Sequence, residues 1–165
     1  MSAKEAFLKT YDEEAARTMR LLRAYPMDKL DLKPSPQLKT ARELAWVFVA
    51  ESMLGGKIWR DEFAKGVPAG KPPAPPQNWN EILSAIEKNQ REFGDIVRKA
   101  SDDDLRVKVH FMVGPKQLGE MTRMDMLWFL LHDQIHHRGQ FSIYQRIAGG
   151  KVPSIYGPTA DEPWI

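Results

Sequence analysis

The sequence predicts an all-α protein, a bundle of four amphipathic helices that forms a single domain over residues 1–165. Apolar residues recur at helical spacing in four segments, and linkers rich in proline or glycine separate these segments. Only one short stretch alternates with the period of two that a strand requires. The length suits one domain with one core, and no internal repeat is visible.

The first two helices are each predicted to begin at a capping box, in which a serine or threonine is followed three residues later by a glutamate. The two boxes are Ser2 with Glu5 and Thr40 with Glu43. Pro26 ends the first helix, because the residue before a proline disfavours helical geometry. In the second helix, Gly55–Gly56 predicts either a kink or an end.

A connection rich in proline, at residues 66–79, leads to the third helix. Its composition fits neither a helix nor a central strand, so we expect a stiff crossover. Such a crossover means that the second and third helices need not be antiparallel neighbours. The third helix is predicted to open at Trp79–Asn80 and to end at the acidic run 101–104.

The last helix follows a short extended segment. Residues 106–113 alternate at period two, which predicts a strand or hairpin, and the last helix then runs from about Thr122 to Gly149–Gly150. The tail, residues 151–165, is expected to lie over the bundle. The apolar positions assigned to the core in the last helix are Leu127, Leu131, Ile135, Ile143 and Ile147.

Composition excludes several functional classes. The 24 basic and 22 acidic side chains nearly cancel and form no basic stripe, which argues against a nucleic-acid surface. The absence of cysteine excludes disulfides, thiolate ligands and cysteine nucleophiles. The N-terminal residues have no signal-peptide core, and the longest apolar runs are too short to span a bilayer. We therefore expect a soluble, cytoplasmic protein without membrane partners.

Three of the four histidines fall in the last helix, in the stretch HDQIHHRGQ at residues 132–140. His132 and His136 lie one turn apart, so both rings can reach one metal ion. His137 points about 100° away from His136 and is better placed to pair with Asp133, one turn earlier. The alternative is a pair of hydrogen-bonded histidines on a partly buried face. Zinc needs at least three protein ligands, so a metal site requires another helix.

This histidine-rich helix and its tail, residues 132–158, are similar to the C-terminal part of the DinB-like (DinB/YfiT-like) superfamily. The segment LKTARELAWVFVAESML, residues 38–54, resembles that family's second helix, and the likeness extends over nearly the whole chain. It implies an up-down-down-up four-helix bundle, a homodimer, and a divalent metal, zinc or nickel, bound by three histidines. Two of these match His132 and His136, and the third matches the position of Val47.

The sequence departs from the family pattern at Val47, because a valine cannot coordinate a metal. The nearest substitute is Glu51, one turn further along the same face, which would give a site of His132, His136 and Glu51. Alternatively, Glu51 forms an ordinary salt bridge, or it bonds the two histidines directly without a metal. His110, in the extended segment, is a more remote candidate.

Two functional hypotheses follow from this resemblance. In the first, the chain is a metal-dependent enzyme with an altered metal site, a hydrolase or a thiol-dependent transferase that acts on a small molecule. The resemblance implies that the metal lowers the pKa of a low-molecular-weight thiol or of water. In the second, the chain is a metal-free dimeric relative that serves as a binding or structural module. The sequence identifies neither a substrate nor a general base.

Overall fold

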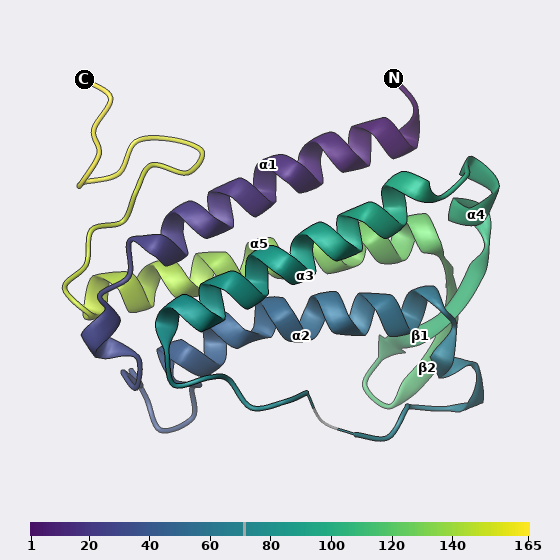
Figure 1. Cartoon of the computed structure of the whole chain (residues 1–165), viewed down its shortest axis with the longest axis horizontal. Helices are drawn as coiled ribbons and strands as arrows, with labels where there is room; N and C mark the ends of the chain where they lie inside the picture. Colours follow the sequence, from purple (N-terminus) through teal and green to yellow (C-terminus); the bar gives the residue numbers. More distant parts are fainter. Residues whose placement is uncertain (71) are drawn as a thin grey trace.

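Four long helices run up, down, down and up in the computed structural model, which describes residues 1–70 and 72–165 (Figure 1). These helices are α1 (Ala3–Arg23), α2 (Ala41–Trp59), α3 (Trp79–Lys99) and α5 (Arg123–Ile147). The shorter elements are η1 (Met27–Lys29), η2 (Glu62–Lys65), α4 (Asp102–Arg106), β1 (Lys108–Gly114) and β2 (Gln117–Thr122). In Figure 1, α1 and α5 point one way and α2 and α3 the other, which confirms the bundle and its topology.

Capping boxes set the starts of three long helices and one short one. In each, a side-chain oxygen accepts the backbone N–H three residues later, and an acidic side chain returns to the cap. The four boxes are Ser2 with Glu5, Thr40 with Glu43, Ser101 with Asp104, and Thr122 with Asp125. The first two confirm the predicted helix starts. The third explains why the acidic run does more than end α3: Ser101 starts α4.

The parallel arrangement of α2 and α3 requires the chain to return along the outside of the bundle. Figure 1 shows the connection after η2 running back beside α2 before α3 begins. The indole Nε1 of Trp46 donates a 2.6 Å hydrogen bond to the carbonyl of Pro73, which fixes the connection to α2. The predicted crossover is thus confirmed; its residue 71 lies outside the described residues.

α2 continues through Gly55 and Gly56 to Trp59, so these glycines do not end the helix. A Cβ atom at Gly55 would lie 2.8 Å from the ring of Phe93 on α3, closer than real Cβ contacts. Glycine is required at this position because the two parallel helices approach each other closely there.

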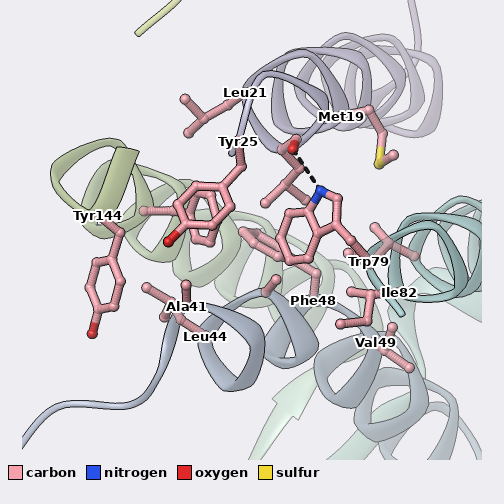
Figure 2. Close-up of a cluster of buried hydrophobic side chains, with 14 of the residues drawn as sticks. Met19, Leu21, Tyr25, Ala41, Leu44, Phe48, Val49, Trp79, Ile82 and Tyr144 are labelled. Carbon is pink, nitrogen blue, oxygen red and sulfur yellow. Dashed lines mark hydrogen bonds between the residues drawn. The ribbon is translucent and has the colours of Figure 1, made fainter. Parts of the chain in front are cut away.

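The core consists of two clusters of buried side chains between the four long helices. Figure 2 shows the first cluster, to which all four long helices contribute, among them Leu21 from α1, Phe48 from α2, Trp79 from α3 and Tyr144 from α5. The indole Nε1 of Trp79 donates a 3.2 Å hydrogen bond to the carbonyl of Leu22, so this polar group is satisfied inside the core. Residues at the core of the second cluster include Phe7, Ile58, Phe93, Val97, Met126, Leu127 and Leu130.

A two-stranded antiparallel hairpin, β1–β2, covers the end of the second cluster. The alternating stretch therefore forms a strand, as predicted. The tail folds back onto α1 and α5 through ion pairs that link Arg20 to Glu162 and Arg146 to Asp161. None of the helices in the described residues is long and apolar enough to cross a membrane.

Candidate metal centre

The structure brings together Glu51 of α2 with Asp133 and His137 of α5. The Nε2 atom of His137 lies 3.3 Å from Oε1 of Glu51 and 3.7 Å from Oδ2 of Asp133. One ligand atom from each residue lies within 4.8 Å of the other two, a spacing that allows all three to bind one metal ion. Two carboxylates and one imidazole therefore form a cluster between the helices.

His132 and His136 do not lie in this cluster. Both are exposed, the His132 ring lies 6.0 Å from that of Trp128, and Nε2 of His136 is 2.9 Å from the side-chain amide of Gln140. Glu51 is close to α5, as expected for a site between these helices, but the histidine beside it is His137. Of the three histidines in this stretch, His137 and not His132 or His136 joins Glu51 in the cluster.

The rotation of α5 about its axis explains why His137, rather than His136, lies beside Glu51. Ile143 and Ile147, assigned to the core from the sequence, are 60% and 52% exposed. The buried face of α5 instead carries Met126, Leu127, Leu130, Leu131, Gln134, Arg138, Phe141 and Gln145. A helix in this rotation brings Asp133 and His137 to the edge that faces α2. Two residues of this buried face, Gln134 and Arg138, are polar. The spacing of apolar residues alone therefore does not show which face of α5 is buried.

The carboxylate of Glu51 is buried and has no hydrogen-bond donor. Its residue is 5% exposed, and neither oxygen accepts a hydrogen bond from any described residue. Burial raises the pKa of Glu51 to about 9, and the negative charge of Asp133 adds to the effect. A buried carboxylate without a partner is costly, since ionisation has to occur away from water. A cation placed against this oxygen pair would supply the missing partner.

Gln140 contacts both neighbouring histidines. Its Oε1 atom lies 3.0 Å from Nδ1 of His137, and its Nε2 atom lies 2.9 Å from Nε2 of His136. With the amide in this orientation, Oε1 accepts from Nδ1–H of a neutral His137 ring, and the lone pair on Nε2 faces the two carboxylates. That tautomer is the one a metal ligand needs, whereas the opposite amide orientation places the proton on Nε2 toward Glu51.

Two adjoining pockets open along the outer face of α2, beneath the connection that follows η2. The first, of about 270 Å³, is lined by Glu51, by Lys57 and by apolar residues of α2, η2 and the connection, including Leu54 and Phe63. The second, of about 770 Å³, includes Trp46 and Val47. Ala50 borders both. Of the three clustered residues, Glu51 is the one that borders this preformed, largely apolar cleft.

The remaining candidates lie elsewhere. Nδ1 of His110 is 3.0 Å from Oδ1 of Asp61, and its Nε2 is 3.7 Å from Glu120 across the hairpin. His110 therefore joins β1 to the end of α2 and takes no part in the cluster. Val47 is half-buried and lies one turn before Glu51 on α2.

Arg138, which follows His137, forms an ion pair across helices. It is 3% exposed, and its guanidinium lies 2.6 Å from Oε2 of Glu14 on α1. The hydroxyl of Tyr156, in the tail, donates to the same carboxylate at 2.6 Å and also meets Arg138. This network fixes the rotation of α5 against α1, and with it the direction in which His137 points.

The fold and the cluster together define a four-helix bundle protein with a candidate metal centre between its second and last helices. A family model, the DinB family, matches residues 1–164. The chain belongs to the DinB family.

Three relatives show how far the likeness extends. The uncharacterized protein YrdA of Bacillus subtilis is 29% identical over 157 residues, which is 94% of this chain and 89% of YrdA. A DinB-like protein of Bacillus cereus superposes with a TM-score of 0.74 at 25% identity, covering 92% of this chain and 97% of its own. YfiT of Bacillus subtilis, described as a probable metal-dependent hydrolase with an unusual four-helix bundle topology, has a TM-score of 0.67 at 13% identity, covering 90% and 89%.

Proposed function

We propose that this DinB-family protein is a metal-dependent enzyme, a hydrolase or a thiol-dependent transferase, in which Glu51, Asp133 and His137 bind a divalent ion. The observation that carries the proposal is the buried Glu51 carboxyl group, which accepts no hydrogen bond from the described residues and lies beside a second carboxylate and an imidazole nitrogen. The description of YfiT as a probable metal-dependent hydrolase supports it at the level of the family fold.

The residues fit a divalent ion by their chemistry. Zinc accepts imidazole nitrogen and carboxylate oxygen, and three protein ligands leave one position open for water or substrate. Carboxylates also suit manganese and nickel, so the ligand set leaves the choice of metal open. An ion held there would act as a Lewis acid that lowers the pKa of a water or thiol and polarises a carbonyl.

The protein's own residues contribute position and surroundings. Gln140 hydrogen-bonds Nδ1 of His137 and so orients its ring, and the buried network of Arg138 and Glu14 holds α5 in its rotation. The apolar pocket beside Glu51 limits the access of water, which strengthens electrostatic interactions inside it. A small substrate would enter through this pocket with its reactive group toward Glu51.

Metal titration tests the proposal. Zinc, nickel and manganese are titrated into the purified protein after treatment with chelator, and calorimetry gives stoichiometry and affinity. We expect one ion per chain, with binding lost in Glu51→Gln and His137→Ala. His132→Ala and His136→Ala are the matched controls, because they remove exposed imidazoles from the same helix. If these controls lose binding while His137→Ala retains it, the site predicted from the sequence is the real one.

The two reaction types are separated by their nucleophiles. The metal-loaded protein is incubated with activated esters and amides, with and without a low-molecular-weight thiol. A hydrolase releases the carboxylic acid and the alcohol or amine without the thiol, whereas a transferase requires the thiol, forms a thioester with the acyl group and releases the alcohol or amine. If neither occurs and no ion binds, the metal-free binding module is the better description.

We also propose that the protein forms a homodimer through the exposed face of α5. Phe129 and Ile143 are 47% and 60% exposed, and the residues between them on this face include His132, His136 and Gly139. No described atom lies within 4 Å of a Cβ built on Gly139, so a second helix could approach closely. Exposed apolar residues that repeat along one helix face are typical of helix–helix contacts.

A further inference from the structure

The pocket beside Glu51 has apolar walls and one cationic side chain among its described lining residues. Leu54 of α2, Phe63 of η2 and Pro68 of the connection contribute apolar walls around a volume of about 270 Å³. Lys57, half-buried near the C-terminal end of α2, also lines the pocket. Glu51 and Lys57 are the only charged side chains among the described residues that line it.

Lys57 has no anionic partner within the described residues. The chain's other ion pairs engage lysines and arginines around the surface, but no described carboxylate lies within 4.0 Å of the Lys57 amine. Its neighbours in the pocket are apolar, so an ammonium group there is screened less than one in open solvent. A bound molecule with a negative charge would supply the missing partner.

The spacing along α2 gives a minimum length for such a molecule. Lys57 follows Glu51 by six residues, which is about 9 Å along the helix axis and about 120° around it. A chain of at least roughly seven bonds is needed to span that axial distance. A shorter anion would reach only one of the two side chains.

We propose that the substrate is an amphipathic organic anion, a small molecule with an apolar chain whose acidic group pairs with Lys57 while its reactive group lies beside Glu51. This inference deepens the function proposed above and rests on it for the reaction. The preference for an organic anion rests only on the pocket and on Lys57. Experiments can therefore refute this preference and the proposed metal-dependent function independently of each other.

Octanoate, octanol and octylamine probe the preference, because they share a chain of the required length and differ in charge. Each is titrated into ¹⁵N-labelled protein, and the amide signals of Ala50, Leu54 and Phe63 report binding in the pocket. We expect octanoate to bind about fivefold more tightly than octanol, with octylamine weakest, as one partly screened ion pair predicts. Butanoate, which cannot fill the pocket, should bind more weakly than octanoate.

Lys57→Met removes the charge and keeps the apolar stem. In this variant octanoate should lose its advantage over octanol, while octanol binds as before. Lys65→Met is the matched control, since Lys65 is an exposed lysine of η2 outside the pocket. Equal affinities of octanoate and octanol for the unmodified protein, no shifts at the pocket signals, or a preference that survives Lys57→Met would each overturn the inference.

Zinc titration of the same variants separates this inference from the proposed function. Lys57→Met should bind zinc as the unmodified protein does, and Glu51→Gln should keep the preference for octanoate while losing zinc. If zinc fails to bind but octanoate is selected through Lys57, the metal centre is refuted and the anion pocket stands. If zinc binds and octanoate is not selected, the substrate class is refuted alone.

Discussion

The carboxylate of Glu51 lies 3.3 Å from Nε2 of His137, yet it accepts no hydrogen bond from the described residues. The two side chains come from α2 and α5, the second and the last of the long helices. Their arrangement places a buried acid, the nearby Asp133 and an imidazole nitrogen around one point. Proteins rarely keep a buried carboxylate unpartnered unless another species binds to it.

Variants of the three clustered residues should weaken zinc binding by unequal amounts. We expect Glu51→Gln and His137→Ala to lower affinity by more than tenfold, since each removes one of three ligands. Asp133→Asn should have a smaller effect, because its side chain is 43% exposed and can be replaced by water. Calorimetric titration measures all three. Unchanged affinity in His137→Ala would contradict the centre.

Replacing Gln140 should disturb His137 without removing a ligand. Gln140→Leu removes the oxygen that accepts from Nδ1, so the ring is free to take the other tautomer or to rotate. We expect zinc affinity to fall about tenfold, the lower end of the effect seen when a partner of a metal ligand is lost. Nitrogen NMR of the metal-free protein should show a mixed population of the His137 tautomers. A single unchanged tautomer in Gln140→Leu would show that the amide does not control the ring.

Glu51→Gln should stabilise the metal-free protein at neutral and higher pH. Burial and Asp133 raise the pKa of Glu51 to about 9, so the folded chain holds a proton that the unfolded chain releases near its ordinary value of 4.5. Folding stability is therefore full below about pH 4.5 and falls as pH rises toward about 9. At pH 7 the loss is on the order of 3 kcal/mol. Urea unfolding with chelator from acid to alkaline pH measures it, and a flat profile for the unmodified protein would contradict it.

The folding stability contributed by the buried pair of Arg138 and Glu14 should fall as pH decreases, the opposite of the effect of Glu51. Burial alone would raise the pKa of Glu14, but hydrogen bonds from Tyr156 and Arg138 outweigh it and lower the pKa below 4.5. The stabilisation is present above that value and is lost as pH falls through the lowered pKa.

Arg138→Leu should cost about 3 kcal/mol at neutral pH, because it removes the buried guanidinium that pairs with Glu14 and leaves Arg17 as the remaining cation on that carboxylate. The control is Arg146→Leu, which removes a half-exposed partner of Asp161 and should cost less than about 1 kcal/mol. Chemical unfolding of both variants gives the comparison. If the two variants lost similar amounts of unfolding free energy, burial would not make the Arg138 ion pair more important to stability than the exposed one.

Ile143→Asp should convert the proposed dimer to a monomer. Ile143 is 60% exposed on α5, so the substitution leaves the core intact while placing a charge in the proposed contact. Sedimentation at several concentrations should show a species of twice 18.9 kDa for the unmodified protein and one chain for the variant. A single-chain species at all concentrations in both would refute the homodimer.

The sequence predicted the bundle because its signals are local. Capping boxes at Thr40 and Thr122, the breaker at Pro26 and the proline-rich crossover each act within a few residues. Such signals do not depend on the rest of the fold, so they can be interpreted without it. The topology itself came from the family resemblance, and the parallel direction of α2 and α3 confirms it.

The site was predicted less well, because it depends on helix rotation. The pairing of Glu51 with α5 was found, but a shift of about 100° separates His136 from His137. That angle is set by the contacts of α5 with α1, above all the buried pair of Arg138 and Glu14, whose residues are distant in sequence. Arg138 was the residue that could have indicated the correct rotation. Its buried ion pair with Glu14 requires that this side of α5 face α1.

The crossover between α2 and α3 gives the protein a way to change its specificity without changing its fold. A tight turn would have sufficed had these helices been antiparallel, but their shared direction makes the chain travel back along the outside of α2 (Figure 1). This segment lines the pockets beside Glu51, whereas the two core clusters are built chiefly from the long helices. Substitutions there can reshape the pocket while the bundle and the cluster of Glu51, Asp133 and His137 stay as they are. We therefore expect sequence differences among family members to be concentrated in the connection between α2 and α3.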